Sequence, residues 1–133
     1  RDIDEILFTK LASSLSSYFT YLENQNTNLI NIVLNNFVYD NGFQIQKYFK
    51  AKGHYIWHND SSHSKLSCRI LAFIWYLNDI EEGGETMFLQ GKIRPTKGKL
   101  VIFPATWTYL HKGHVPLSDN KYIITGWISV PTY

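Results

Sequence analysis

The sequence has only one cysteine and no long apolar run, and both absences narrow the class of protein. A lone Cys68 excludes an internal disulfide and favours a reducing compartment. No apolar stretch approaches the roughly 18 residues that a membrane span needs, and no cationic, apolar leader is present. We therefore expect a cytoplasmic protein without membrane attachment.

Charge of one sign is also scarce. The 13 lysines and arginines nearly balance the 11 aspartates and glutamates, which leaves a formal net charge of +2. No cluster of basic residues is interleaved with aromatics, so we expect no nucleic-acid partner. Aromatic residues, by contrast, make up 16% of the chain and fall mostly in its second two-thirds. The length of 133 residues supports a single domain with one hydrophobic core.

The hydrophobic period differs between the N-terminal segment and the rest of the chain. Over residues 4–23, apolar side chains recur at steps of three or four, which predicts an amphipathic helix built on Leu7, Leu11, Leu15, Phe19 and Leu22. Residues 29–37 predict either a second short helix or a strand. After a turn at Asp40, Asn41 and Gly42 the period changes to two.

Segments with the length and composition of strands dominate the second part of the chain, at residues 42–49, 69–77, 99–104 and 121–130. Because no helical pattern separates them, they predict an antiparallel sandwich or barrel. We therefore expect one domain over residues 1–133 that is mainly β with N-terminal helices. In it, residues 1–38 form a helical support and residues 42–130 form the β core.

The stretch "HYIWHND" at residues 54–60 raises the question of a metal site. In an extended segment, residues i and i+2 project from the same face, so His58 and Asp60 point the same way. A histidine from another strand would complete a set of two histidines and one carboxylate, which suits non-haem Fe(II). Downstream, His111 and His114 are both available for this role.

The motifs from Gly42 to Ile128 resemble those of the iron- and 2-oxoglutarate-dependent dioxygenases, and most closely the prolyl 4-hydroxylase-like branch. The similar segments are "GFQIQKY", "GHYIWHND", "RILAFIWYLNDIEEGGET", "GKLVIFPA" and "HKGHVPLSDNKYIITGW", in the order of the family. The resemblance implies a double-stranded β-helix, which is a jelly roll of the cupin-like kind. It also implies Fe(II) and 2-oxoglutarate as cofactor and cosubstrate.

The resemblance assigns roles to individual residues. His58 and Asp60 match the proximal metal ligands, and His111 matches the distal ligand. The distal ligand is His111 rather than His114 because the family places its 2-oxoglutarate-binding basic residue about ten positions later, where Lys121 stands. Lys121 would therefore hold the far carboxylate of 2-oxoglutarate.

Other residues match the walls of the cosubstrate pocket and the substrate site. Tyr48 and Thr86 match hydroxyls that bond the same carboxylate, and Trp127 matches an aromatic wall beside it. Tyr55 and Arg69 match residues near the substrate. An arginine that opens a run as apolar as "ILAFIWYL" needs a partner or a wet cavity, because burying it unpaired is costly.

Further aromatic residues are candidates for the walls or rim of the site: Trp57, Trp75, Trp107 and Tyr109. For Trp75, packing in the core is the default interpretation. Without the motif context, Tyr48, Tyr55 and Trp127 would be interpreted as core aromatics, and Thr86 as part of a turn. The short loop of residues 61–67 departs from the family and leaves the substrate open.

The reaction that the resemblance implies is the hydroxylation of an unactivated C–H bond in a prolyl residue of a peptide or protein. It consumes 2-oxoglutarate and O₂, releases succinate and CO₂, and uses ascorbate as a reductant. One alternative is the same chemistry on a free amino acid, another side chain or a nucleobase. Another is a metal- or sugar-binding jelly roll without catalysis, but such a protein has no need of a buried lysine at position 121. The oligomeric state is left open.

Overall fold

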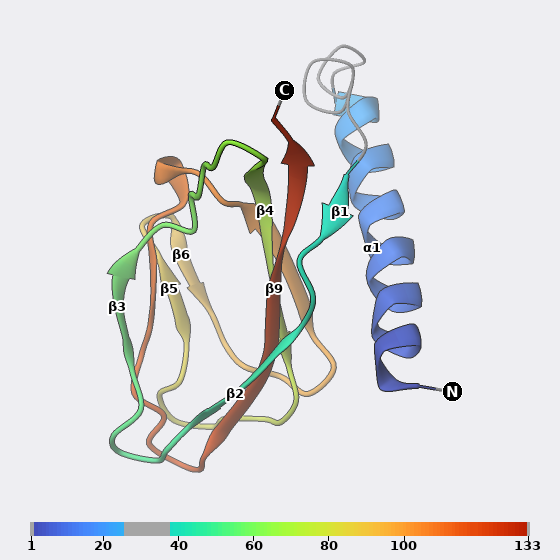
Figure 1. Ribbon diagram of the computed structural model, residues 1–133. Coiled ribbons are helices and arrows are strands. Elements are labelled where there is room, and N and C mark those ends of the chain that lie inside the picture. The colour runs from blue at the N-terminus through green and yellow to red at the C-terminus, as the bar shows by residue number, and fades with distance from the viewer. Residues whose placement is uncertain (1, 26–37, 133) are drawn as a thin grey trace. The chain divides into compact units, whose positions relative to one another are not determined.

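The computed structural model describes residues 2–25 and 38–132 and divides the chain into two compact units, residues 1–38 and 39–133. The first unit contains helix α1 (Ile3–Gln25) (Figure 1). Its least exposed apolar residues include the predicted stripe, in which Leu11 and Leu15 are buried, so the predicted helix is confirmed. The prediction for residues 29–37 lies outside the described residues. Within the described ranges, no helix is both long and apolar enough to cross a membrane.

The second unit consists of two antiparallel sheets that form two layers (Figure 1). The larger sheet has the order β1-β9-β4-β7, with β2 also paired to β9. Its strands are β1 (Tyr39–Asp40), β2 (Gln44–Tyr48), β4 (Ser67–Tyr76), β7 (Leu100–Pro104) and β9 (Lys121–Pro131). The smaller sheet has the order β3-β8-β5-β6. Its strands are β3 (Tyr55–His58), β5 (Thr86–Phe88), β6 (Gly91–Ile93) and β8 (His111–Gly113).

The two sheets give the layered arrangement of a jelly roll, so the predicted fold class is confirmed. A single 3₁₀ turn, η1 (Trp107–Tyr109), precedes β8 in the part of the chain that the structure describes. Residues packed between the layers form the core: Ala72, Ile74, Tyr76, Phe103 and Ile123. Alternation along each strand delivers these side chains to the inner face.

Strand β9 lies between β2 and β4 in the larger sheet. It pairs with β2 along one edge and with β4 along the other. The register with β2 places Tyr48 opposite Lys121 and Gln44 opposite Thr125. Alternate residues of a strand share a face. The side chains of Gln44, Gln46 and Tyr48 therefore point to the same side of the sheet as that of Lys121.

Two glycines shape the connection that carries the chain from β4 to β5. Gly83 and Gly84 have φ angles of 69° and 72°, a left-handed conformation that side chains with a Cβ rarely adopt. A Cβ on Gly84 would lie 3.0 Å from the Ile80 side chain, and one on Gly83 would collide with the carbonyl oxygen of Val115. This tight turn places Thr86 at the start of β5, on the inner side of the smaller sheet.

Candidate metal centre and cosubstrate pocket

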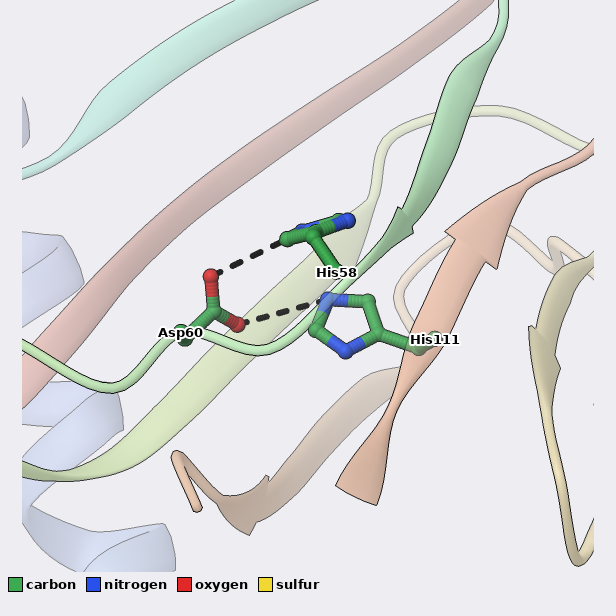
Figure 2. A group of neighbouring side chains, drawn as sticks. All are labelled: His58, Asp60 and His111. Atoms are coloured by element: carbon green, nitrogen blue, oxygen red, sulfur yellow. Dashed lines mark ion pairs between the residues drawn. The ribbon is translucent and has the colours of Figure 1, made fainter. Parts of the chain in front are cut away.

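Three side chains converge where β3 ends and β8 begins (Figure 2). His58 ends β3 and lies directly across from His111, the first residue of β8. Asp60 follows β3 by two residues, and its carboxylate points at both imidazoles. Nε2 of His111 is 3.3 Å from one carboxylate oxygen, and Nε2 of His58 is 3.7 Å from the other. One ligand atom from each of the three residues lies within 4.8 Å of the others.

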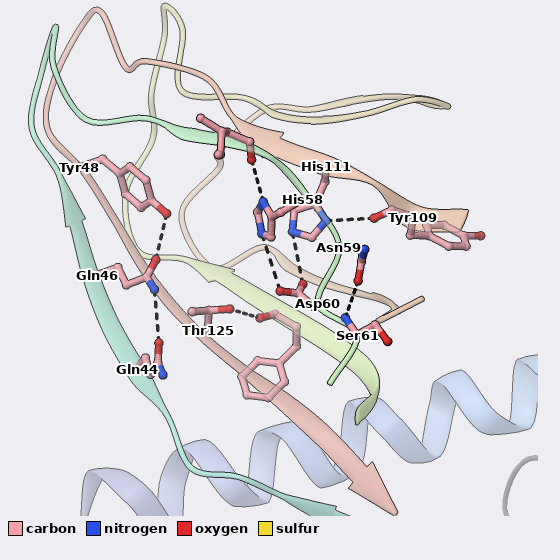
Figure 3. Close-up of polar contacts among 12 residues, drawn as sticks. Gln44, Gln46, Tyr48, His58, Asn59, Asp60, Ser61, Tyr109, His111 and Thr125 are labelled. Atoms are coloured by element: carbon pink, nitrogen blue, oxygen red, sulfur yellow. Dashed lines mark hydrogen bonds and ion pairs between the residues drawn. The ribbon is translucent and has the colours of Figure 1, made fainter. Parts of the chain in front are cut away.

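Backbone carbonyl groups orient both imidazole rings. Nδ1 of His58 is 2.8 Å from the carbonyl oxygen of Ile56, and Nδ1 of His111 is 3.0 Å from that of Tyr109 (Figure 3). Because a carbonyl oxygen only accepts, Nδ1 carries the proton in each ring and Nε2 turns a lone pair toward Asp60. Holding the second ring nitrogen in this way is typical of metal-binding histidines. Burial lowers the pKa of His111, which keeps its ring neutral.

The donor set suits a divalent transition metal. Nitrogen and oxygen ligands about 2.0–2.2 Å from a metal and at right angles to each other lie about 3 Å apart. The observed separations of 3.3 and 3.7 Å approach this value, so small side-chain adjustments would close the site. Two histidines and one carboxylate form the facial set that non-haem Fe(II) uses while it keeps positions open.

The three residues of the triad line a cavity of about 120 Å³ that side chains of both sheets enclose. The same cavity is lined by all four of the predicted cosubstrate residues, Tyr48, Thr86, Lys121 and Trp127, and by Tyr55. A wider, open groove of about 620 Å³ adjoins it and is lined by Arg69. The cavity and the groove share the side chains of Tyr55, His58, Asp60 and Trp127.

Lys121 is a buried cation without a buried anionic partner. Its residue is 2% exposed, and Nζ donates a 2.7 Å hydrogen bond to the carbonyl oxygen of Gly84. Among residues 2–25 and 38–132, no carboxylate lies within ion-pair distance of this nitrogen. Burial lowers the pKa of Lys121 to about 8, and the charge of Glu85 opposes this shift. An ammonium with two unused N–H groups facing a cavity is suited to receive an anion.

Two tyrosine rings lie near this ammonium. Nζ lies 5.0 Å from the centre of the Tyr48 ring and 5.6 Å from that of Tyr76. The Tyr76 hydroxyl is 2.6 Å from Oγ1 of Thr86. Nε1 of Trp127 is buried and has no hydrogen-bond partner in the part of the chain that the structure describes. The residues of one cavity thus include, within the described ranges, a buried donor without a partner and an ammonium without a counter-ion, and both favour an anionic ligand.

Arg69 begins an apolar run in β4, yet its charge is not buried without a partner. Its guanidinium stacks on the Trp127 ring at 3.7 Å and faces the open groove. The structure therefore brings together all nine residues that the sequence singles out: the triad and the cosubstrate residues around the cavity, and Tyr55 and Arg69 at the groove. Their placement is observed, whereas their roles stay predictions.

Some expectations about neighbouring residues do not hold. Trp57 and Trp107 are 45% and 75% exposed and line neither the cavity nor the groove, so these two candidates for the walls or rim of the site do not form its walls. Trp57 instead lies under the ammonium of Lys112 on the outer side of the smaller sheet. His114, in contrast, lies outside the triad as expected, with Nδ1 3.3 Å from a carboxylate oxygen of Glu85.

Three lining or supporting residues were missed at the level of sequence: Gln44, Gln46 and Tyr76. The two glutamines share the inner face of β2 with Tyr48, so strand alternation could have found them. Tyr76 ends the apolar run of β4 on the same face as Ile74, where a hydroxyl among apolar residues is the only signal.

Comparison with known proteins gives the same family that the sequence motifs resemble. Residues 43–129 match the family model described as the 2OG-Fe(II) oxygenase superfamily. Prolyl 4-hydroxylase 13 of Arabidopsis thaliana is 29% identical over 105 residues, which cover 57% of this chain and 38% of the relative. The chain thus spans well under half the length of the curated relatives that it matches.

Solved structures share the fold. The viral collagen prolyl hydroxylase of Paramecium bursaria chlorella virus-1, in its 2OG complex, is similar with a TM-score of 0.67 and 24% identity, covering 91% of this chain and 72% of that one. A Trichoplax adhaerens prolyl hydroxylase in complex with a peptide fragment of hypoxia inducible factor has a TM-score of 0.60 and 22% identity, covering 83% and 55%. Because the matching family model spans well over half of the residues and contains the His58–Asp60–His111 triad, this chain belongs to the 2OG-Fe(II) oxygenase superfamily.

Proposed function

We propose that this chain is an Fe(II)- and 2-oxoglutarate-dependent dioxygenase that hydroxylates a prolyl residue in a peptide or protein and releases succinate and CO₂. The observation that carries the proposal is the position of Lys121. A buried ammonium that has no carboxylate partner among the described residues lines the same small cavity as two histidines and an aspartate that converge. A protein that only binds a metal or a sugar gains nothing from burying this charge.

The residues divide into two groups by chemistry. His58, Asp60 and His111 would hold Fe(II), which supplies oxygen activation for the decarboxylation of 2-oxoglutarate and the coupled hydroxylation. Lys121 would pair with the far carboxylate of 2-oxoglutarate as a point charge. When the Tyr76 hydroxyl donates to Thr86, the proton of the Thr86 hydroxyl is free for the same carboxylate. Trp127 lines the same cavity, and its buried Nε1–H has no hydrogen-bond partner among the described residues.

The adjoining groove supports a peptide substrate. At about 620 Å³ it is several times larger than the inner cavity, and it opens beside the metal-binding residues. The Arg69 guanidinium stacks on Trp127, so its N–H groups are held in place to donate to peptide carbonyl groups. Prolyl hydroxylation is named for several similar proteins, one of them solved with a peptide fragment. A free amino acid or another side chain is the second candidate, and the net charge of +2 disfavours a nucleic acid.

Three further points belong to the proposal. Ascorbate would serve as the reductant, the protein would act in the cytoplasm, and residues 1–133 would work as one domain.

The proposal is tested by titrating the protein with Fe(II) and then 2-oxoglutarate without oxygen, and by measuring succinate after oxygen is admitted. We expect one Fe(II) per chain, 2-oxoglutarate binding that depends on Fe(II), and succinate release stimulated by a proline-containing peptide. The same peptide with its proline replaced by alanine is the matched control. If the protein bound Fe(II) and 2-oxoglutarate but released no succinate with any of a panel of proline-containing peptides, the non-catalytic alternative would be favoured.

The pKa of Lys121 predicts how 2-oxoglutarate binding depends on pH. The anion pairs with the protonated lysine only, so affinity is fully present below about pH 8 and falls as the pH rises through this value. Loss of one required proton weakens binding by up to about tenfold per pH unit above the pKa. Anaerobic titrations between pH 7 and 9.5 would show this decline. In Lys121→Arg the decline should be absent, because a guanidinium does not lose its proton in this range.

A further inference from the structure

A chain of three polar side chains runs along the inner face of β2. The Tyr48 hydroxyl donates a 2.9 Å hydrogen bond to Oε1 of Gln46, and Nε2 of Gln46 donates to Oε1 of Gln44 at 3.4 Å (Figure 3). All three residues line the cavity that contains Lys121 and the triad. Neither glutamine has a role in holding the metal or in the ion pair proposed for 2-oxoglutarate.

The direction of the first hydrogen bond conflicts with a direct contact between Tyr48 and an anion. A phenol has one proton, and in this structure that proton points to Gln46. Burial raises the pKa of Tyr48, so the hydroxyl keeps its proton at neutral pH. While the proton is given to Gln46, the phenolic oxygen can offer an anion beside Lys121 only its lone pairs, which repel it.

A side-chain amide can resolve this conflict because it carries an acceptor at one end and two donors at the other. If the Gln46 amide turns by half a rotation, its N–H group faces the Tyr48 oxygen and the phenolic proton is released toward the cavity. Gln44 is exposed, so its amide is free to turn as well and to donate to Gln46. The whole chain then points its donors in one direction, toward the anion, and each bond polarises the next.

The geometry points to Gln46 as a positioning residue that sets whether the Tyr48 proton faces the strand or the cosubstrate. This inference rests on the proposed binding of 2-oxoglutarate at Lys121. Only a side chain that both accepts and donates can play this part. A glutamate of the same shape accepts the phenolic proton in a stronger, charge-assisted bond and has no N–H to return.

The test is a double-mutant cycle read out as 2-oxoglutarate affinity in the Fe(II)-loaded protein without oxygen. We expect Gln46→Glu to weaken binding by at least about tenfold, since the cosubstrate must break a charge-assisted hydrogen bond. In the Tyr48→Phe background the same change should weaken binding by no more than about threefold, because only charge repulsion remains. Ile45→Glu, which adds the same charge to β2 on the opposite face at a side chain that is 71% exposed, is the matched control and should weaken binding by no more than about threefold.

A second variant keeps the inference testable if the glutamate disturbs folding. Gln46→Met removes the acceptor of the Tyr48 proton. In this background the effect of Tyr48→Phe on 2-oxoglutarate affinity should differ at least about twofold from its effect in the wild type, as expected for two residues in direct contact. Equal effects of the Gln46 changes in both Tyr48 backgrounds would overturn the inference and leave the proposed function standing. A wild-type protein that binds no 2-oxoglutarate would overturn both.

Discussion

The change His111→Ala is expected to reduce Fe(II)-dependent turnover more than about 100-fold, whereas His114→Ala should retain most of the activity. Loss of a residue that only supports a metal ligand already costs roughly 10–100-fold in affinity or activity, so loss of a ligand costs more. Nε2 of His111 lies 3.3 Å from Asp60, in the cluster of three donors. His114 is turned away to the Glu85 carboxylate, and its side chain is half exposed.

Fe(II) stoichiometry and succinate release, measured on the same preparations, would check this prediction. The His111 ring packs against Phe88 and Phe103, so its removal also leaves a hole in the core. A thermal melt of each variant and the larger replacement His111→Gln would separate loss of the ligand from loss of the fold. If His114→Ala were inactive and His111→Ala active, the motif alignment would be shifted by three residues.

The metal site could be predicted from the sequence because it depends on short, regular spacings. A strand places residues i and i+2 on one face, which was enough to pair His58 with Asp60. The long strands β4 and β9 were predictable for the same reason, because they extend over ten and eleven residues, long enough for an apolar run and an alternating pattern to show. The choice of His111 over His114 came from its spacing to Lys121 in the family pattern, and the cross-strand pairing of His58 with His111 agrees with it.

Other features depend on tertiary pairing, which no local pattern records. Strands β3, β5, β6 and β8 have only three or four residues each, too few to show a period. They exist because they pair with one another across the smaller sheet. The exposed position of Trp57 follows from such a pairing, since a register shift lies between Tyr55 and His58 in the pairing of β3 with β8. Aromatic composition alone could not tell an outward ring from a wall of the pocket.

The direction of the hydrogen bonds was equally hidden. The sequence predicted that Tyr48 lies beside 2-oxoglutarate, but only the structure shows that the Tyr48 hydroxyl donates to Gln46. Likewise, the support of Thr86 by Tyr76 joins strands of different sheets. The sequence thus predicted which residues gather at the site, and the structure adds which of their donors are free. Among the described residues, the buried ammonium of Lys121 donates to the carbonyl oxygen of Gly84 alone, and the buried indole N–H of Trp127 has no partner.

The change Lys121→Ala is expected to weaken 2-oxoglutarate binding by at least about tenfold while Fe(II) binding survives. A charge-assisted contact contributes roughly 1.5–3 kcal/mol, and a factor of ten corresponds to 1.4 kcal/mol. Lys121 is 2% exposed, and within the described residues its ammonium donates to the carbonyl oxygen of Gly84 and has no partner of opposite charge. It is not among the three residues whose donor atoms converge, which is why the metal should still bind.

Two further variants make the test specific to the buried charge. Lys121→Arg should keep part of the affinity, since the charge remains but the planar guanidinium needs more room than the ammonium. Lys47→Ala is the matched control, because it removes the same charge from β2 on the opposite face, where Nζ lies over the rings of Phe49 and Tyr122. Separate anaerobic titrations of Fe(II) and 2-oxoglutarate on each variant would decide the matter. Unchanged 2-oxoglutarate affinity in Lys121→Ala would mean that the buried ammonium does not bind the cosubstrate, and the proposed function would then lose the observation that carries it.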